Sequence, residues 1–236
     1  MSNALTRAGH GLSLSEKRLV MLAVSKLDSR RNWTADELLK LTTRVTASEY
    51  AETYGVDMDT AYDSLQSAAK HLYDRSITIF EPAFTRKGKP LKDTIRTDMR
   101  WVGECKYYKD QGFVELAWWH RIIPALVNLR QHFTQYQLEQ TSALRSVYSW
   151  KLLELLMRFQ STGWAEYSIE DFCAAMDATD KQKTNFNNIK RRIIEPAIKE
   201  LCEKDSWIIN WQVIKTGRKV TRLRFTFLRD PQRRLL

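Results

Sequence analysis

The sequence predicts an α+β fold in which a helix-turn-helix followed by a β-hairpin occurs twice in tandem. Three observations lead to this. Helical and then β-like hydrophobic periods follow one another in the same order in both halves, helix-capping signatures recur at matching positions, and a basic turn lies among the β-like segments of each half. A chain of 236 residues with 43% hydrophobic residues and eight Trp can fill two cores of ordinary domain size.

The first half opens with helical signatures. Apolar residues recur at helical spacing over residues 15–27, and a second helix is expected over residues 35–42. Thr46 and Glu49 form a capping box, which marks the start of a third helix, and a further helix begins near Asp59. This succession predicts a helix-turn-helix.

A β-like stretch follows at residues 77–80 and leads into the basic turn 85–90. Alternating residues return at 101–102, 107–108 and 113–116, and we interpret these segments as the strands of a wing. The candidate phosphate contacts in the basic turn are Arg86, Lys87 and Lys89.

The second half repeats this order. A long amphipathic helix is expected over residues 141–163, Ser168 and Asp171 repeat the capping pattern, and another helix runs over residues 181–203. Two strands and the basic turn between them then follow, at residues 207–214, 220–228 and 215–219.

An internal repeat between the two halves, which we call the internal echo, is the main evidence for the domain organisation. Adding 122 to a residue number carries Thr46 onto Ser168, and adding 124 carries Leu65 onto Ile189, as one short insertion would produce. Chance agreement between two amphipathic helix pairs is the alternative. We favour a pseudo-twofold duplication of two domains, at residues 1–135 and 141–236.

Charge and composition limit the function. Lys and Arg number 38 against 28 Asp and Glu, a net charge of +10, so the surface should attract nucleic acid or an anionic membrane. No apolar stretch approaches the ~20 residues of a membrane span, and no secretory pattern opens the chain, so we expect a cytoplasmic protein that does not enter a membrane. Three scattered Cys predict neither a zinc site nor a disulfide framework.

No catalytic or cofactor motif is present. The chain lacks the glycine-rich loops that hold nucleotide phosphates and the Gly-x-Ser-x-Gly turn of hydrolases. Its four His are isolated, so no His pair exists to bind the metal that a tyrosine nicking reaction uses. We therefore expect no enzyme activity, no metal and no cofactor.

The helix over residues 181–203 is the candidate reader of DNA. Its apolar residues, among them Ile189 and Ile193, fall on one side at 100° per residue and must face the core. The other side and the helix entrance are polar and basic, suited to base edges and phosphates, although a solvated basic face is the alternative. The candidate contacts here are Lys181, Lys183, Thr184, Asn185, Asn188, Lys190, Arg191 and Arg192.

The second hairpin should lie along the DNA backbone. Six basic residues occur with no acid between Ser206 and Arg229. Residues 141–236 hold 18 basic and 11 acidic residues, a net +7, whereas residues 1–140 hold 20 and 17, a net +3. The candidate phosphate contacts in this hairpin are Lys215, Arg218, Lys219 and Arg222.

The corresponding helix of the first half differs. Its outward side mixes Asp63, Ser67, Lys70 and Asp74, which suits protein contact better than DNA reading. We therefore expect the first domain to serve dimerisation with auxiliary DNA contact, and the second to hold sequence-specific binding.

Short segments along nearly the whole chain resemble the RepE/π-type family of plasmid replication initiators. Each is modestly specific, while their order and spacing together are strongly so. They are SNALT at 2–6, LSL at 12–14, EKR at 16–18, IIPAL at 122–126, FTQY at 133–136, SVY at 146–148, LLELL at 152–156, Phe186, IKRR at 189–192 and PAIKEL at 196–201.

The resemblance implies two winged-helix domains and a role in the bacterial cytoplasm. It implies a monomer that binds iteron direct repeats at an origin and promotes opening of A+T-rich DNA. It also implies a homodimer, joined through the first domain, that binds an inverted repeat and represses its own gene. Host DnaA, the replicative helicase and chaperones are the implied partners. The alternative is a winged-helix transcriptional regulator without a replication role, for which a lone palindrome beside the gene would argue.

Overall fold

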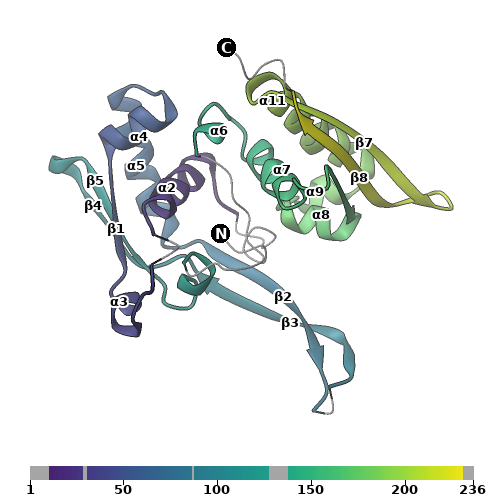
Figure 1. Cartoon of the computed structure of the whole chain (residues 1–236), viewed down its shortest axis with the longest axis horizontal. Helices are drawn as coiled ribbons and strands as arrows, with labels where there is room; N and C mark the ends of the chain where they lie inside the picture. The colour runs from purple at the N-terminus through teal and green to yellow at the C-terminus, as the bar shows by residue number, and fades with distance from the viewer. Residues whose placement is uncertain (1–10, 29–30, 87, 128–137, 231–236) are drawn as a thin grey trace. The chain divides into compact units, whose positions relative to one another are not determined.

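The computed structural model describes residues 11–28, 31–86, 88–127 and 138–230. The chain divides into two compact units, residues 1–132 without 53–55, and residues 133–236 with 53–55. Each unit contains helices and a three-stranded antiparallel sheet (Figure 1).

In the first unit, two helices lie in sequence between the first strand of the three-stranded sheet and its other two strands. A separate two-stranded hairpin also precedes those two strands. The elements are α2 (Leu14–Ser25), α3 (Ala35–Leu39), β1 (Thr42–Thr46), α4 (Ala47–Tyr54), α5 (Met58–Leu72), β2 (Ser76–Phe84), β3 (Pro90–Arg100), β4 (Val102–Tyr108), β5 (Phe113–Trp118) and the 3₁₀ turns Lys109–Gln111 and Ile123–Ala125.

The second unit follows the same order without the extra hairpin. Its elements are α6 (Glu139–Ser142), α7 (Val147–Met157), β6 (Trp164–Ser168), α8 (Ile169–Ala175), α9 (Asp180–Lys183), α10 (Phe186–Ile189), the π turn Lys190–Ile194, α11 (Glu195–Lys204), β7 (Trp207–Thr216) and β8 (Lys219–Arg229).

Equivalent sheets confirm the predicted pair of winged-helix domains. The strand order is β1-β5-β4 in one sheet and β6-β8-β7 in the other, so the last strand of each domain lies in the middle. Thr46 ends β1 and Ser168 ends β6, and the side chain of each accepts the backbone N–H three residues later. The predicted caps are therefore the hinges at which each first strand becomes a helix.

The cores follow the predicted helical phase. Tyr50 and Phe172, matched by the internal echo, are both fully buried, as are Leu65 and its counterpart Ile189. Burying side chains of this size stabilises a fold by roughly 1.5–3 kcal/mol each.

Two predicted helices prove shorter than expected. The helix predicted over residues 35–42 ends at Leu39, because the Thr-rich, β-branched segment that follows pairs with β5 as strand β1. The helix predicted over residues 141–163 begins only at Val147, and residues 149–157 are buried on all sides rather than along one stripe. A helix buried on every side has no amphipathic pattern from which its ends can be read.

The first wing comprises only the later part of what the sequence analysis grouped as a wing, the predicted segments 107–108 and 113–116. The basic turn 85–90 closes β2–β3, a separate two-stranded ribbon (Figure 1), while the wing itself is β4–β5. Gly112 closes that wing at φ +62°, a conformation that glycine adopts without strain. Most described side chains of the ribbon are at least partly exposed, so its strands lack a continuous buried alternation that would separate them from a wing.

One carboxylate ties α7 to α11 in the second domain. Glu200 accepts the backbone N–H groups of Arg145 at 2.7 Å and Ser146 at 3.2 Å, just before α7 begins. We expect Glu200→Ala to lower the free energy of unfolding by about 1–3 kcal/mol, because two backbone donors lose a charged acceptor. Urea unfolding of the full chain followed by circular dichroism measures this.

Glu203→Ala is the matched control, because the Glu203 carboxylate makes only a loose pair with Lys199 at 3.9 Å on the exposed side of the same helix. Its effect should stay within about 0.5 kcal/mol. Equal losses in the two variants would contradict the capping role of Glu200.

Candidate nucleic-acid interface

The helix-turn-helix of the second domain contains a break that the sequence analysis did not anticipate. The continuous helix predicted over residues 181–203 is wrong: α9 ends at Lys183, and Asn185 is extended, with φ −151° and ψ 156°. The Asn185 side chain then accepts the N–H of Asn188 at 3.0 Å and caps α10. Thr and Asn side chains compete with helical bonding in this way, which explains why the chain breaks here.

The break assigns new roles to three residues predicted to contact bases. Asn188 Nδ2 donates to the Lys181 carbonyl at 3.2 Å and to Thr184 Oγ1 at 2.9 Å. Thr184 Oγ1 in turn donates to the Lys181 carbonyl at 2.9 Å. Thr184, Asn185 and Asn188 thus hold the turn together, and the Asn188 amide has both N–H groups engaged.

The helix predicted to read DNA therefore starts at Phe186 and runs through α10, the π turn and α11. We refer to it as the reading helix. Its buried side includes Ile189, Ile193, Ala197 and Leu201, as predicted, while the Phe186 ring packs near Trp211 with centroids 6.3 Å apart. This contact fixes the start of the helix against strand β7. The helix then presents its opposite side to solvent.

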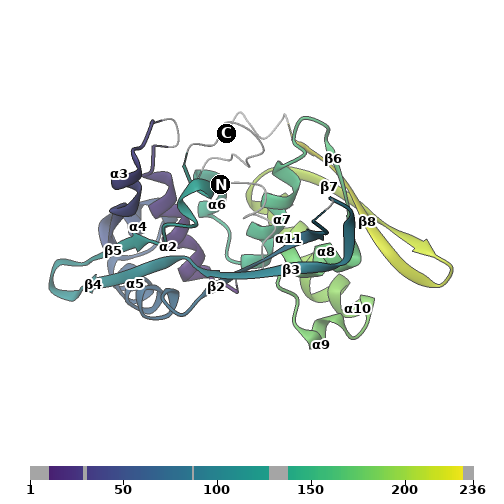
Figure 2. The ribbon, with the colours of Figure 1, turned by 90° about the horizontal axis from the view of Figure 1, so that it is seen from below.

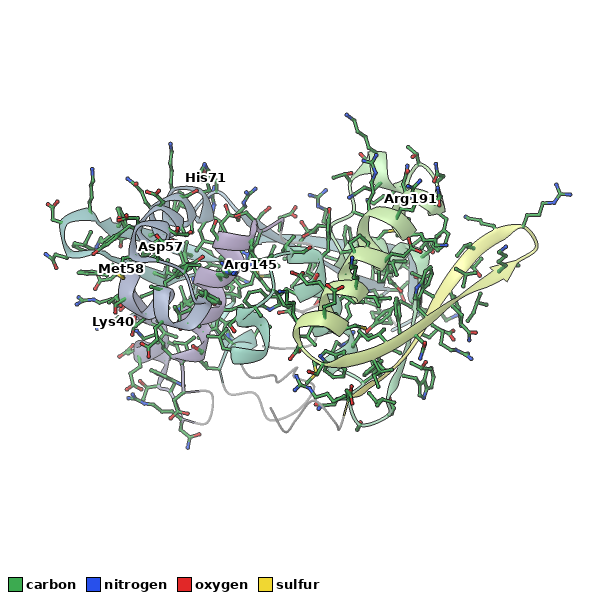
Figure 3. The ribbon with its side chains drawn as sticks, turned by 90° about the horizontal axis from the view of Figure 1, so that it is seen from above. Lys40, Asp57, Met58, His71, Arg145 and Arg191 are labelled. Atoms are coloured by element: carbon green, nitrogen blue, oxygen red, sulfur yellow. The ribbon has the colours of Figure 1, made fainter. Side chains whose placement is uncertain are left out.

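That solvent side carries Asn187, Arg191 and Arg192, all exposed. Figure 3 labels Arg191 on this helix. Asn187 was not among the predicted contacts, because in a continuous helix from Lys181 it lies between the predicted outward side and the apolar side. With the cap at Asn185, it becomes the first outward side chain of the helix.

A π turn follows at residues 190–194, where the Glu195 N–H bonds to the Lys190 carbonyl. Pro196 comes next and has no N–H to donate, which weakens regular helical bonding at this point. Lys190 is less available than predicted, because its ammonium group pairs with Glu195 at 3.5 Å. At the helix entrance Lys181 is exposed, while Lys183 lies 3.8 Å from the Asp180 carboxylate.

The second wing ends in a tight basic turn. Thr216 pairs with Lys219 across Gly217 and Arg218, and Gly217 has φ +62°. Such a two-residue turn favours glycine at its first position. Lys215, Arg218 and Lys219 are exposed, and within the described ranges no ion pair is formed by these three side chains. Figure 2 shows the β7–β8 hairpin as a long projection.

Further along the hairpin, the basic residues have acidic partners. Arg222 Nη1 lies 2.8 Å and Arg224 Nη2 lies 2.7 Å from the carboxylate of Glu166, on β6. Hydrogen bonds from Arg224 and then Arg222 hold the pKa of the Glu166 carboxyl below its usual value. Arg229 pairs with Asp205 at 2.9 Å. Although the hairpin itself contains no acid, acids elsewhere in the domain pair with Arg222, Arg224 and Arg229. In the described structure its unpaired positive charge therefore lies near the turn.

The equivalent helix of the first domain begins with acids. Asp57 caps α5 by accepting the Thr60 N–H at 2.8 Å, and this bond lowers the pKa of its carboxyl. Asp59 and Asp63 are exposed on the helix that follows (Figure 3 labels Asp57 and Met58). An acidic helix start repels phosphate, so this helix is a poor match for the DNA backbone.

The predicted basic turn of the first domain lies at the end of the β2–β3 ribbon. Arg86 and Lys89 are exposed there, and the Thr85 N–H donates to the Lys89 carbonyl at 2.8 Å to close the turn. Lys87 falls outside the described residues, as does the segment 133–136.

Other classes of site leave no trace in the part of the chain that the structure describes. No three His, Cys, Asp or Glu side chains gather there as metal ligands would. Burial raises the pKa of the Cys105 thiol to about 12, which keeps it from acting as a nucleophile. None of the described helices has the length and apolarity that crossing a membrane requires.

Known proteins resemble this chain over nearly all of its length. Residues 1–157 match the family described as initiator replication protein, WH1, and residues 168–227 match initiator Rep protein, WH2. An uncharacterized 27.6 kDa protein of Escherichia coli is 24% identical over 225 residues, which cover 92% of this chain and 90% of that protein. The PI protein of Escherichia coli is 23% identical over 256 residues, covering 97% of this chain and 81% of that protein.

A solved structure shares the fold. The crystal structure of Pi initiator protein in complex with iteron DNA matches with a TM-score of 0.75 and 21% identity, over 97% of this chain and 94% of that one. The first family match covers the first winged-helix domain and extends to the end of α7, and the second covers the rest of the second domain from the end of β6 into β8. The chain therefore belongs to the initiator replication protein family, with WH1 as its first domain and WH2 as its second.

Proposed function

We propose that this protein initiates plasmid replication by binding iteron direct repeats as a monomer and promoting opening of the origin. The observation that carries the proposal is the second domain, which holds both the exposed reading helix and the exposed basic turn at residues 215–219, which we call the wing tip. The similar Pi initiator protein was solved in complex with iteron DNA, which supports the same class of ligand here.

Base reading falls to the start of the reading helix. Arg191 can pair bidentately with guanine and Asn187 with adenine, and both are exposed. Recognition helices contact base edges with residues near their N-terminus, which is where Asn187 lies. Thr184, Asn185 and Asn188 position that terminus rather than read the DNA.

Phosphate contacts fall to the wing tip and the helix entrance. Lys215, Arg218 and Lys219 have no ion pair within the described ranges, so their charge is fully available to the DNA backbone. Lys181 is exposed beside the turn and adds to this field. Arg222 contributes less, because Glu166 already offsets its charge.

The first domain supplies dimerisation. Its β2–β3 ribbon exposes four large apolar side chains, each at least half exposed, and a two-stranded ribbon leaves strand edges free to pair. They are Phe80, Phe84, Leu91 and Ile95. A twofold dimer joined here would bind an inverted repeat and repress its own gene, whereas a monomer fits each direct repeat singly.

The protein acts by binding, without a catalytic step of its own. Host DnaA, the replicative helicase and chaperones remain the expected partners, and the bacterial cytoplasm the expected location. A pure transcriptional regulator with the same modules would need no direct repeats.

Footprinting of the full chain on the plasmid region that encodes it tests the proposal. We expect protection of several direct repeats, with permanganate-reactive thymines appearing in adjoining A+T-rich DNA. Protection of a lone palindrome without any opening would support the regulator instead.

The division between helix and wing is tested by paired substitutions. Arg191→Ala or Asn187→Ala should reduce discrimination between an iteron and a scrambled duplex by about 1–3 kcal/mol, because a bidentate base contact is lost. Lys219→Ala should weaken both duplexes alike and reduce the slope of log K against log[salt] by about one. Fluorescence anisotropy over a salt series measures all three variants.

Lys199→Ala is the control for this series, since Lys199 is exposed on α11 away from the start of the reading helix. It should change neither discrimination nor salt slope. If Lys219→Ala altered base preference and Arg191→Ala did not, the roles of helix and wing would be reversed.

The ribbon's role in dimerisation is tested by Phe80→Ser. Removing exposed apolar surface from the interface should lower affinity for the inverted repeat while sparing or raising binding to a single direct repeat, because more monomer becomes available. Sedimentation velocity and anisotropy report the two effects. Leu39→Ser removes an equally exposed side chain from outside the ribbon and should leave both unchanged.

A further inference from the structure

The outer face of the second domain's sheet carries an exposed apolar patch. Trp164 is 49%, Ile208 42% and Leu228 54% exposed. Ile208 pairs directly with Leu228, and Trp164 pairs with Thr226 two residues along the same strand. The alternate residues of these strands are buried against the helices, so the three apolar side chains share the solvent side. We refer to Trp164, Ile208 and Leu228 as the sheet patch.

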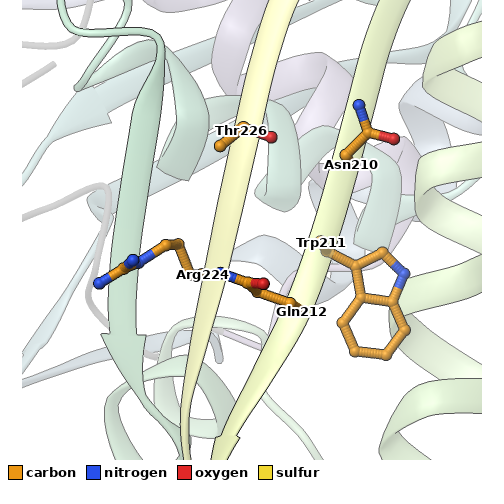
Figure 4. A pocket seen from close by; sticks show the side chains of 5 residues that line it. All are labelled: Asn210, Trp211, Gln212, Arg224 and Thr226. Carbon is orange, nitrogen blue, oxygen red and sulfur yellow. The ribbon is translucent and has the colours of Figure 1, made fainter.

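A hollow of about 160 Å³ adjoins the sheet patch (Figure 4). Trp211 lines it together with the polar side chains of two successive cross-strand pairs, Asn210 with Thr226 and Gln212 with Arg224. Their amide and hydroxyl groups can both donate and accept hydrogen bonds. Such groups beside an apolar patch suit a peptide, whose backbone alternates donors and acceptors.

A fixed cation borders the sheet patch. Arg224 donates through Nε at 2.9 Å and through Nη2 to Glu166, and its guanidinium lies 5.7 Å from the centroid of the Trp164 ring. Glu166 orients this group, yet a guanidinium has five N–H donors, so others stay available for a second carboxylate. Because Glu166 also pairs with Arg222, the two arginines outnumber the acid that holds them.

Nucleic acid is a poor match for this patch. The pair Ile208–Leu228 lies eight residues along β7 from the Thr216–Lys219 pair, or roughly 26 Å at strand spacing, so contacts at the wing tip leave it uncovered. Of the three side chains in the patch, only Trp164 offers a flat ring on which a base can stack, and the Arg224 guanidinium already lies near that ring. A second copy is not the proposed occupant, because the dimer proposed above is joined through the β2–β3 ribbon of the first domain.

We propose that the sheet patch and Arg224 form a docking surface for an acidic segment of another protein. Apolar side chains of that segment cover Trp164, Ile208 and Leu228, its carboxylates meet Arg224, and its backbone forms hydrogen bonds with the polar side chains that line the hollow. The surface operates while the reading helix and wing tip hold DNA, so the second domain connects the origin to a protein partner.

The test uses the full chain bound to its duplex site and a fluorescent synthetic peptide in which Glu alternates with Leu. We expect the peptide to bind, and Ile208→Thr with Leu228→Thr to weaken binding by about tenfold or more, because central apolar contacts dominate such interfaces. Thr keeps the strand propensity of these positions, and circular dichroism verifies folding. Arg224→Gln should weaken binding of the same peptide. A peptide with Lys in place of Glu should not bind the wild type.

Matched variants separate this proposal from the proposed function. The Thr double variant should bind duplex DNA like the wild type, and Arg191→Ala should lose DNA discrimination while still binding the peptide. Leu39→Ser should alter neither. The proposal is overturned if the wild type does not bind the peptide, if the Lys peptide binds equally, or if a single-stranded oligonucleotide displaces the peptide. It is also overturned if the Thr double variant loses the self-association that the wild type shows.

Discussion

The hydrogen bond from the Asn188 N–H to the Asn185 side chain sets where the polar helix of the second domain begins. It separates the short helix α9 from the helix that starts at Phe186, whose solvent side carries Asn187 and Arg191 because Ile189 and Ile193 face the core. In a helix running on unbroken from Lys183, Thr184 and Asn188 would instead project from the same side as Arg191. The contact between Phe186 and Trp211 secures the same helix start against the sheet.

The unpaired positive charge of the β7–β8 hairpin lies toward its turn, because Glu166 on the neighbouring strand β6 pairs with the arginines nearer the domain. The tip keeps Lys215, Arg218 and Lys219 without acidic partners in the described structure, whereas Glu166 on β6 neutralises part of the hairpin nearer the domain. Positive potential is thereby concentrated where a wing meets a phosphate backbone. The same Glu166 fixes Arg224 beside Trp164, so one carboxylate shapes both the wing and the sheet patch.

Much of the fold could be predicted from local patterns in the sequence. Capping at Thr46 and Ser168, and the helical phase of Leu65 and Ile189, identified both helix-turn-helix units correctly. Strand β1 was missed because only Val45 of its five residues is apolar, so no apolar alternation marks it. The ribbon β2–β3 was grouped with the wing strands because both are hairpins with exposed polar residues.

The candidate site was harder to predict than the fold. Its residue types and its helix followed from composition and phase, but the role of each Asn depended on side-chain bonds that act across the turn. The pairing of the hairpin arginines depended on Glu166, which is more than fifty residues away in sequence. Sequence spacing carries no signal for contacts of that kind.

The π turn at residues 190–194 has a consequence for how the family's DNA readers can diverge. One additional residue in a turn shifts the following helix by about 100° relative to what precedes it. Here Ile193 and Ile194 are both fully buried, so the wide turn places two adjacent residues in the core. The turn thus sets the angular register of residues 186–189 relative to α11, and deleting a single residue within it would rotate one segment against the other by about 100°.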